Sequence, residues 1–427
     1  MVGLARSGVA VARALRAHGE VIGCDTGRPD GFTELEGEGI EVHANTAGVE
    51  LLDRARTVIK SPGVPQAAAV VRAARERGMC VVGELEVAWR LLPNEFLAVT
   101  GTNGKTTTVE LLGAIHRAAG LDARVAGNVG TAAASLVSEI APEATVVCEA
   151  SSFQLEDAEA FAPECAVLLN VTPDHLDRHG SVEAYRAAKA RIFASQGSED
   201  VSVTAPSLRP SGQARWVSFG TPDADLALED GRLFWGGEPF MPASDVRLRG
   251  AHNLENAMAA AAAALARGIA PGPVSEALST FAGVPHRLEE VARIGGVLWV
   301  NDSKATNPDS ARVGIESFPR GVHVILGGHL KGGGFGSLRA PLEAHCRAAY
   351  LIGDAAGQLE SDLEGAGVAL ERCGDLETAV RSAARAARDG EVVLLSPACA
   401  SYDQYASYEE RGAHFRGLVA GLVGAKR

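Results

Sequence analysis

The stretch FLAVTGTNGKTTTVELLGAI, residues 96–115, constrains the fold more than any other part of the chain. Strand-forming residues are followed by two closely spaced glycines, Gly101 and Gly104, and then by a segment typical of a helix. In this order the backbone N–H groups of the loop face a phosphate at the N-terminus of the helix. Lys105 can reach the outer phosphates and the hydroxyl of Thr106 can ligate Mg²⁺, so the segment predicts a nucleotide site.

The spacing of this loop is shorter than usual. The common phosphate-binding loop has the pattern G-x-x-x-x-G-K-[ST], but Val99 stands where its first glycine would be, and the nearest upstream glycine is Gly101. A glycine-rich turn without a ligand is the alternative interpretation. The strand, the glycines, the Gly-Lys-Thr triplet and the helix occur in the required order, which favours nucleotide binding.

The length and the alternation of elements predict three α/β domains. A chain of 427 residues is long enough for two or three domains. Its opening, Gly3-x-Ala5-x-x-Gly8 with Asp25 closing the next strand, approximates the dinucleotide-binding fingerprint, although only two residues precede Gly3. We therefore expect a Rossmann-like domain at residues 1–83, a central phosphate-loop domain at 84–283 and a C-terminal Rossmann-like domain at 284–427.

Strand and helix patterns alternate through the two later domains, which predicts mostly parallel sheets covered by helices. The region 200–242 is richer in Gly, Pro and Asp, and we expect a less regular β excursion there. The alanine-rich run at 257–266 predicts a helix. The expected strands are 57–63, which ends in a turn, 96–100, 145–150, 165–171, 297–300, 322–326, 349–352 and 391–395.

Composition excludes several classes of protein. The net charge of −13 argues against a general nucleic-acid binder. No apolar run is long enough for a membrane span, and the N-terminus lacks the pattern of a signal peptide. The seven cysteines form no C-x-x-C pair, so neither a disulfide framework nor a zinc site is indicated. A cytoplasmic protein without membrane or nucleic-acid partners is the expectation.

Lysine is rare and its placement is informative. Only six of the 40 basic residues are lysines, and four of them, Lys105, Lys189, Lys304 and Lys331, fall inside candidate motifs. An arginine-rich chain keeps lysine where a compact charge or a reactive amine is required. A bias in base composition explains the scarcity but not the placement.

Two polar groups in the central segment are candidate metal ligands. Glu149 ends the apolar strand TVVCE, at the edge where ligands gather in open α/β sheets. The sequence NVTPDHLDRHG then places Asp174 and His175 beyond the next strand. Such a cluster suits Mg²⁺, although Asp174 is equally suited to cap a helix. We interpret Asp177 and His179 in the same stretch as structural.

Lys189 lies at an unusual position for a charged residue. In the helix expected from residue 181, Tyr185, Lys189, Ile192 and Phe193 fall at i, i+4, i+7 and i+8, so the lysine is on the apolar stripe. Lysines in such positions usually extend their ammonium group to solvent. The alternative is a desolvated lysine with a lowered pKa and a neutral, chemically available amine.

Three polar loops follow strands in the last segment, so they converge on one edge of one sheet. They carry two lysines and several hydroxyls, a plausible cup for a small molecule with two carboxylates. Arg287, in HRLE at the expected domain junction, can reach a γ-phosphate. The loop residues are Asp302, Ser303, Lys304, Thr306 and Asn307, then Lys331, and then Ser401, Tyr402 and Tyr408.

Together these motifs resemble the Mur ligases over essentially the whole chain. GTNGK-T is shared with folylpolyglutamate synthases and marks the superfamily, whereas NDSKATN and SPACAS-DQ are typical of the Mur ligases that add D-glutamate. The resemblance implies ATP- and Mg²⁺-dependent amide formation in peptidoglycan precursor synthesis. The carboxylate of UDP-N-acetylmuramoyl-L-alanine would become an acyl phosphate, which the amine of D-glutamate attacks. A monomer is expected.

The resemblance also implies a role for each matching residue. The catalytic residues would be Lys105, Glu149, His175 and Lys189. The metal ligands would be Thr106, Glu149, His175 and Lys189, the last as a carbamate. The ATP site would comprise Gly101, Thr102, Asn103, Gly104, Lys105, Thr106, Thr107, Asn253, Asn256, Arg287 and Asp302. The UDP-substrate site would comprise Arg6, Ser7, Asp25, Thr26, Ser61, Asn128 and Ser152. The D-glutamate pocket would comprise Thr306, Lys331, Ser401 and Tyr408.

Three departures from the family pattern stand out. The start of the first strand is missing. Gly27 follows the Asp-Thr pair where relatives often have arginine, and Arg28 is the candidate substitute. His329 stands where relatives commonly have aspartate, which bears on the pH dependence or shape of the amino-acid pocket.

Two other functions are considered. One is a folylpolyglutamate synthase, which the NDSKATN and SPACAS loops argue against. The other is a non-catalytic nucleotide switch or dinucleotide-binding module, which leaves the polar loops of the third segment unexplained.

Overall fold

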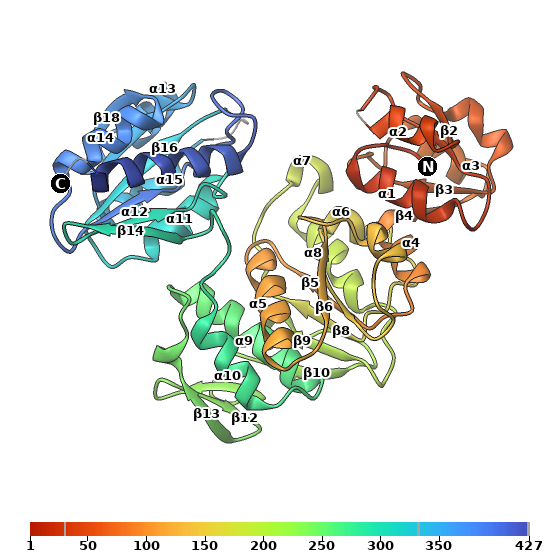
Figure 1. The fold of residues 1–427 in the computed structure, drawn as a ribbon, viewed down its shortest axis with the longest axis horizontal. Helices are drawn as coiled ribbons and strands as arrows, with labels where there is room; N and C mark the ends of the chain where they lie inside the picture. Colours follow the sequence, from red (N-terminus) through yellow and green to blue (C-terminus); the bar gives the residue numbers. More distant parts are fainter. Residues whose placement is uncertain (30, 331–333, 425–427) are drawn as a thin grey trace. The chain divides into compact units, whose positions relative to one another are not determined.

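The computed structural model describes residues 1–29, 31–330 and 334–424 (Figure 1). The chain forms two compact units, which are described separately. Unit one comprises Met1–Arg247 and Glu255–Phe281, and unit two comprises Leu248–Leu254 and Ala282–Arg427. In the part of the chain that is described, no helix is both long and apolar enough to cross a membrane.

The first segment of unit one contains two small parallel sheets, one of β1 and β2 and one of β3 and β4. Val2 forms single parallel bridges to Cys24 and to Lys60, so it lies between the two sheets. A cavity of about 560 Å³ lies beside Met1 and is lined by β1 and β3. The strands are β1 (Ile22–Cys24), β2 (Glu41–His43), β3 (Thr57–Lys60) and β4 (Cys80–Gly83). The helices are α1 (Arg6–Leu15), α2 (Gly31–Gly37), η1 (Val49–Arg54), α3 (Ala69–Glu76) and α4 (Glu84–Leu91).

A six-stranded parallel sheet forms the core of the central segment, in the order β10-β9-β8-β5-β7-β6. All residues of β5, β7, β8 and β9 are buried, as expected for strands covered on both faces. Helix α5 packs on β6 and β7, and α10 packs on α5. The strands are β5 (Phe96–Thr100), β6 (Ala123–Gly127), β7 (Thr145–Glu149), β8 (Cys165–Leu168), β9 (Val201–Thr204) and β10 (Arg215–Ser218). The helices are α5 (Lys105–Ala118), η2 (Ala133–Ser138), α6 (Ser152–Leu155), α7 (Leu176–His179), α8 (Val182–Ala190), η3 (Arg191–Phe193), η4 (Pro206–Leu208), η5 (Ala243–Asp245), α9 (Ala251–Ala266) and α10 (Pro271–Thr280).

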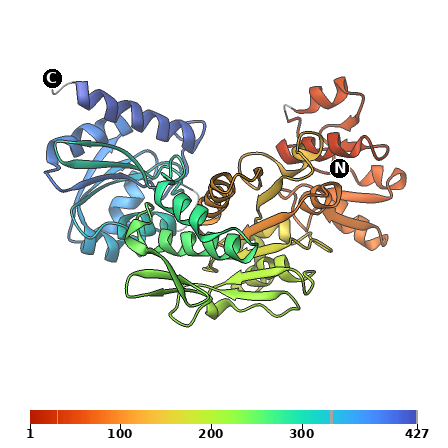
Figure 2. The ribbon, with the colours of Figure 1, turned by 60° about the horizontal axis from the view of Figure 1, so that its bottom comes forward.

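The irregular β excursion is narrower than the sequence indicated. Strands β9 and β10 continue the parallel sheet, and only the later part forms a separate antiparallel sheet, drawn in light green in Figure 2. Helix α9 also begins six residues before the expected 257, because HNLENA extends the alanine-rich run. The antiparallel strands are β11 (Leu226–Glu229), β12 (Arg232–Trp235) and β13 (Glu238–Pro242).

Unit two is built on a six-stranded sheet in the order β14-β15-β19-β16-β17-β18. Only β14, which the sequence did not reveal, is antiparallel to its neighbour. Because β15, β19 and β16 are adjacent and parallel, their following loops meet at one edge, as predicted. The strands are β14 (Glu289–Ile294), β15 (Val297–Asn301), β16 (Val322–Gly327), β17 (Cys346–Ile352), β18 (Ala369–Gly374) and β19 (Val392–Leu395). The helices are α11 (Pro308–Glu316), η6 (Gly336–Leu338), α12 (Arg339–His345), α13 (Ala356–Leu363), α14 (Leu376–Ala386) and α15 (Tyr408–Gly424).

Candidate active site

The glycine-rich loop joins β5 to α5 as the sequence predicted. Gly101 has φ of 157° and Gly104 has φ of 89°, so both adopt backbone conformations that other residues rarely take. A Cβ atom on Gly104 would lie 2.1 Å from Oδ1 of Asn256, so a side chain there would displace that of Asn256. Glycine is therefore required where Asn256, on α9, meets the loop.

The segment after β8 holds this loop in place. The side-chain amide of Asn170 accepts from the N–H of Asn103 at 2.9 Å and donates to the Asn103 carbonyl at 3.1 Å. The hydroxyl of Thr102 likewise accepts from the N–H of Thr172 and donates to its carbonyl, both at 3.1 Å. These contacts explain why β8 ends at Leu168 instead of continuing to residue 171, since the following residues bind the loop.

Lys105 lies over the loop that precedes it. Its Nζ donates to the carbonyl of Gly101 at 2.9 Å and to that of Thr102 at 3.0 Å. An ammonium group therefore stands directly at the turn where the sequence predicts phosphates.

Glu149, at the end of β7, lies at the centre of the candidate metal site. Its carboxylate accepts from the Thr106 hydroxyl at 2.7 Å and from the Asn128 side-chain amide at 3.1 Å, and the residue is only 2% exposed. A carboxylate beside a hydroxyl is an oxygen donor set that suits Mg²⁺, which commonly takes one or two carboxylates together with substrate phosphates and water. Within the described residues no cluster of three or more His, Cys, Asp or Glu side chains forms a metal site.

Lys189 is buried, and its ammonium group does not extend to solvent. The residue is 1% exposed, Nζ donates to the Gly101 carbonyl at 2.8 Å, and it lies 4.5 Å from the centre of the Tyr185 ring. Burial, together with the nearby charge of Lys105, lowers the pKa of Lys189 to about 6, although Asp174 and Glu149 act in the opposite direction. The geometry thus favours the desolvated alternative.

The two histidines of this region differ in environment. His175 is about half exposed, has φ of 51°, lies 3.6 Å from the Asp174 carboxylate and packs its ring on Phe153. His179 is buried, with Nδ1 at 2.9 Å from Glu156 and Nε2 at 3.0 Å from the Ser152 hydroxyl. Burial lowers the pKa of His179. The Ser152 hydroxyl is therefore already engaged by a histidine.

The residues expected around a uridine group lie on the loops of the first segment. The Asp25 carboxylate accepts from the N–H groups of Leu4 and Gly27, at 2.7 and 2.9 Å, so it shapes the loop before α1. The Ser7 and Ser61 hydroxyls are 3.4 Å apart. Arg6 and Thr26 are exposed. Arg28, the candidate substitute for the missing arginine, lies 3.6 Å from Glu36.

In unit two, Asp302 follows β15 and is 4% exposed. Its carboxylate accepts from the Ser396 hydroxyl at 2.8 Å and from the Leu288 N–H at 3.2 Å. Burial raises the pKa of Asp302 to about 6, against the opposing charge of Arg287. Asn253, also in this unit, donates to the Arg249 carbonyl at 2.8 Å. Internal hydrogen bonds therefore hold Asp302 and Asn253 in this part of the expected nucleotide site.

The loops expected to form the amino-acid pocket do meet at one edge. Ser401 is buried, Thr306 is partly buried, and the Tyr408 carbonyl accepts from the Ser303 hydroxyl at 2.8 Å. His329 forms an antiparallel bridge with Ala400. Lys331 lies outside the described residues.

Sequence reasoning missed Arg411, the residue that ties these loops together. It is 1% exposed, and its guanidinium donates to the carbonyls of Ser303, Cys399 and Ala400 at 2.9, 3.1 and 3.2 Å and to the Ser303 hydroxyl at 3.0 Å. Burial lowers its pKa to about 10. In the sequence Arg411 follows the acidic pair Glu409–Glu410, and such a run of charges is typical of the exposed face of a helix.

The structure forms two compact α/β units, with a short phosphate-type loop in the first of them, and comparison with known families divides the chain into three domains. The chain matches three family models: Mur ligase MurD-like, N-terminal domain, at residues 1–83; Mur ligase middle domain, at 99–264; and Mur ligase, glutamate ligase domain, at 286–399. The chain belongs to the Mur ligase family.

Among similar proteins are two named UDP-N-acetylmuramoylalanine–D-glutamate ligase. That of Acidobacterium capsulatum is 42% identical, with 100% of this chain and 96% of the relative covered, and that of Koribacter versatilis is 40% identical, with 98% and 96% covered. Solved structures share the fold. The UDP-N-acetylmuramate–alanine ligase MurC of Thermotoga maritima has a TM-score of 0.62 at 20% identity, covering 98% of each chain. MurF ligase of the same organism, solved with ADP, has a TM-score of 0.64 at 18% identity, covering 88% and 97%.

Proposed function

We propose that this chain is an ATP-dependent ligase that joins D-glutamate to UDP-N-acetylmuramoyl-L-alanine during peptidoglycan precursor synthesis. The observation that carries the proposal is the identity of about 40% along the whole chain with ligases of that name. The same observation weighs against the folylpolyglutamate and non-catalytic alternatives. The phosphate-type loop after β5 and the polar loops at the strand ends of unit two support it.

In the proposed reaction a carboxylate oxygen of the uridine substrate attacks the γ-phosphorus of ATP, and ADP leaves. The resulting acyl phosphate is a far better electrophile than a carboxylate. The amine of D-glutamate then adds to the carbonyl carbon, the tetrahedral intermediate loses phosphate and a proton, and the amide remains. Catalysis of such transfers rests mainly on positioning and electrostatic stabilisation.

Each domain has a part in this reaction. We propose that residues 1–83 bind the uridine nucleotide through Arg6, Ser7, Asp25, Thr26 and Ser61, with Asn128 and Ser152 near the reacting carboxylate. Residues 84–283 would bind the phosphates through the loop 101–107, together with Asn256. Residues 284–427 would bind D-glutamate through Thr306, Lys331, Ser401 and Tyr408. Asn253, Arg287 and Asp302 would complete the ATP site.

The residues at the loop suit a Mg²⁺-dependent phosphoryl transfer. Thr106 and Glu149 would hold the ion, with His175 and a carbamate on Lys189 as further ligands, and Mg²⁺ when bound neutralises charge on the phosphates. The buried Lys189 amine supports the carbamate, because an amine whose pKa is lowered to about 6 is mostly neutral near pH 7 and can add CO₂. Lys105 would stabilise the transferred phosphoryl group.

The test is phosphate release from the purified chain with ATP, Mg²⁺, UDP-N-acetylmuramoyl-L-alanine and a panel of amino acids. We expect turnover only with D-glutamate, in a monomeric enzyme of the cytoplasm. Equal turnover with L-glutamate or meso-diaminopimelate would contradict the amino-acid assignment. Absence of turnover with any amino acid would favour the nucleotide-switch alternative.

A further inference from the structure

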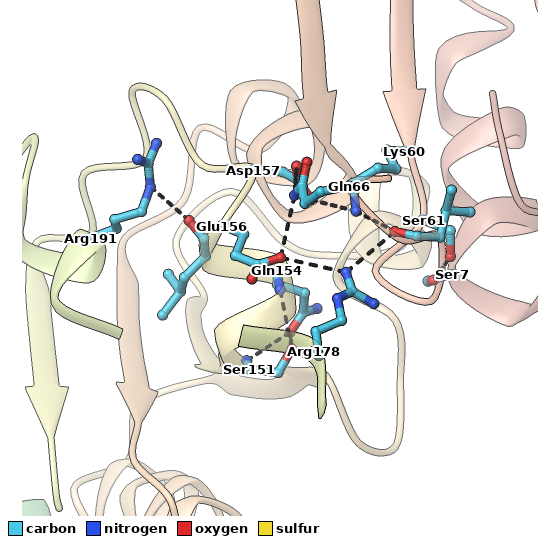
Figure 3. Close-up of polar contacts among 12 residues, drawn as sticks. Ser7, Lys60, Ser61, Gln66, Ser151, Gln154, Glu156, Asp157, Arg178 and Arg191 are labelled. Atoms are coloured by element: carbon cyan, nitrogen blue, oxygen red, sulfur yellow. Dashed lines mark hydrogen bonds and ion pairs between the residues drawn. The ribbon is translucent and has the colours of Figure 1, made fainter. Parts of the chain in front are cut away.

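Two buried charges face each other within unit one, away from the phosphate loop. Nζ of Lys60, the last residue of β3, lies 2.7 Å from Oδ2 of Asp157, and the two side chains are 0% and 1% exposed (Figure 3). Asp157 follows α6 by two residues, so the pair joins the first segment to the central one. Burying a charge is costly, and such a pair contributes little net stability compared with apolar residues of similar size. Its presence therefore needs a different reason.

Lys60 also closes the turn that follows it. Its Nζ donates to the Val64 carbonyl at 2.8 Å, while the Val64 N–H donates to the Ser61 carbonyl at 3.0 Å. We call residues 61–64 the Ser61 turn. Because side chains alternate along a strand, Lys60 points toward Asp157 while the next residue, Ser61, presents its hydroxyl to Ser7 (Figure 3). One side chain thus connects the Ser61 turn to Asp157.

Asp157 is held from other directions as well. Its Oδ1 accepts from the Gln66 side-chain amide at 2.8 Å, and its carbonyl accepts from the Gly83 N–H at 3.1 Å. A Cβ atom on Gly83 would lie 2.8 Å from Cβ of Asp157, so the two backbones are as close as glycine allows. Arg178 adds a longer contact to the Val64 carbonyl at 3.3 Å. The central segment therefore contacts the Ser61 turn directly through Arg178 and indirectly through the Asp157 contacts with Lys60 and Gln66.

The segment that carries Asp157 begins at the candidate active site. Glu149 ends β7, and Ser151 caps the short helix α6. The side-chain oxygen of Gln154 in turn accepts from the Ser151 N–H at 2.9 Å. Ser152, on the same helix, is bonded to His179. Only seven residues lie between Glu149 and Asp157, and they are internally bonded, so a shift of Asp157 would be passed to Ser152 and Glu149.

We propose that the Lys60–Asp157 pair is a positioning device, which sets the separation between the Ser61 turn and the β7–α6 segment so that the substrate carboxylate reaches the phosphate loop. This role rests on the proposed function, since it assumes that Ser61 binds the uridine substrate. Lys60 and Asp157 touch no reacting atom and act through Ser61 and through the β7–α6 segment. A buried pair of opposite charges is suited to this task, because moving the two groups apart would leave each charge unpaired in an apolar environment, which is strongly unfavourable.

The test uses the double variant Lys60→Met/Asp157→Leu, which removes both charges together and so leaves no unpaired buried ion. Lys60→Met alone serves as the single-partner comparison. Arg77→Met is the matched control, because Arg77 forms a 2.8 Å ion pair with Asp53 in the same segment, but on the surface, where the Arg77 side chain is 42% exposed. Each protein is assayed for kcat, for the KM of ATP, for calorimetric binding of UDP-N-acetylmuramoyl-L-alanine and for amide hydrogen exchange of residues 61–66.

The double variant is expected to lose about 100-fold in kcat, the scale of a misplacement near 1 Å, while the KM of ATP changes less than about twofold. Amides 61–66 should exchange faster than in the wild type, and Arg77→Met should match the wild type. A double variant with wild-type kcat and unchanged exchange would overturn the proposal. If the wild type itself does not turn over the uridine substrate, the proposed function fails. Comparing the exchange of amides 61–66 in the double variant and in the wild type then still tests whether the pair holds the Ser61 turn.

Discussion

Asp302→Asn offers a measurable test of how unit two is built. The carboxylate is buried, and its pKa is raised from 3.8 to about 6. At 1.36 kcal/mol per unit, a shift of about two units corresponds to about 3 kcal/mol. The folded state binds this proton more tightly than the unfolded chain does. The free energy of unfolding of the wild type therefore falls by about 3 kcal/mol as pH rises from about 4 to about 6, and it falls no further through this group above about pH 6.

Asparagine can keep both contacts of this side chain. Its Oδ1 can accept from the Leu288 N–H, and its amide can donate to the Ser396 hydroxyl, which now donates to the carboxylate. Asp302→Asn never carries the charge, so its free energy of unfolding should exceed that of the wild type by almost nothing near about pH 4 and by about 3 kcal/mol above about pH 6. Less favourable hydrogen bonds in Asp302→Asn would lower its free energy of unfolding by about 1 kcal/mol, which offsets part of this gain.

The assay is hydrogen exchange of peptides from β15 and β19 under increasing urea, at several pH values, with the full chain. This readout isolates unit two from unit one. Asp309→Asn is the matched control, because it makes the same chemical change at an exposed position on α11. A difference between Asp302→Asn and the wild type that stays constant from about pH 4 to about pH 7 would refute the reasoning, since no proton would then be linked to folding.

Three further substitutions test the site. Thr106→Val should lower kcat/KM for ATP at least about tenfold while Thr106→Ser retains most activity, because a hydrogen bond to a charged group contributes about 1.5–3 kcal/mol; equal losses would show that the hydroxyl is not the important group. Lys189→Arg should fold yet be nearly inactive in a phosphate-release assay, because guanidinium stays protonated and cannot form a carbamate; full activity in CO₂-depleted buffer would exclude that role. Arg411→Met should lower the free energy of unfolding of unit two by at least about 3 kcal/mol, since several buried carbonyls lose their donor, and Arg411→Lys should recover only part of that loss. Urea titration followed by exchange of the β19 peptides measures the change, and an unchanged midpoint would contradict the prediction.

Local patterns in the sequence were sufficient for much of the fold. Strand β5 and the start of α5 were predicted at their observed residues, because a glycine-rich loop between an apolar run and a helix former is a local signal. Strands β6, β14 and β18 were among those that were missed. Their burial is partial, and β14 pairs antiparallel at a sheet edge, so their short sequences lack a continuous apolar run. The lysine on an apolar stripe was visible in the sequence, but its contact with Gly101 was not.

By itself the sequence determined the α/β class, the phosphate-type loop and the candidate residues at strand ends, because these depend on neighbours within a few positions. Tertiary structure decided which distant groups meet. Lys60 and Asp157 are 97 residues apart in the numbering, and Arg411 reaches Ser303 from more than a hundred residues away. A charge buried by remote packing leaves no local periodicity, since its partner and its desolvation are supplied by segments that only folding brings together.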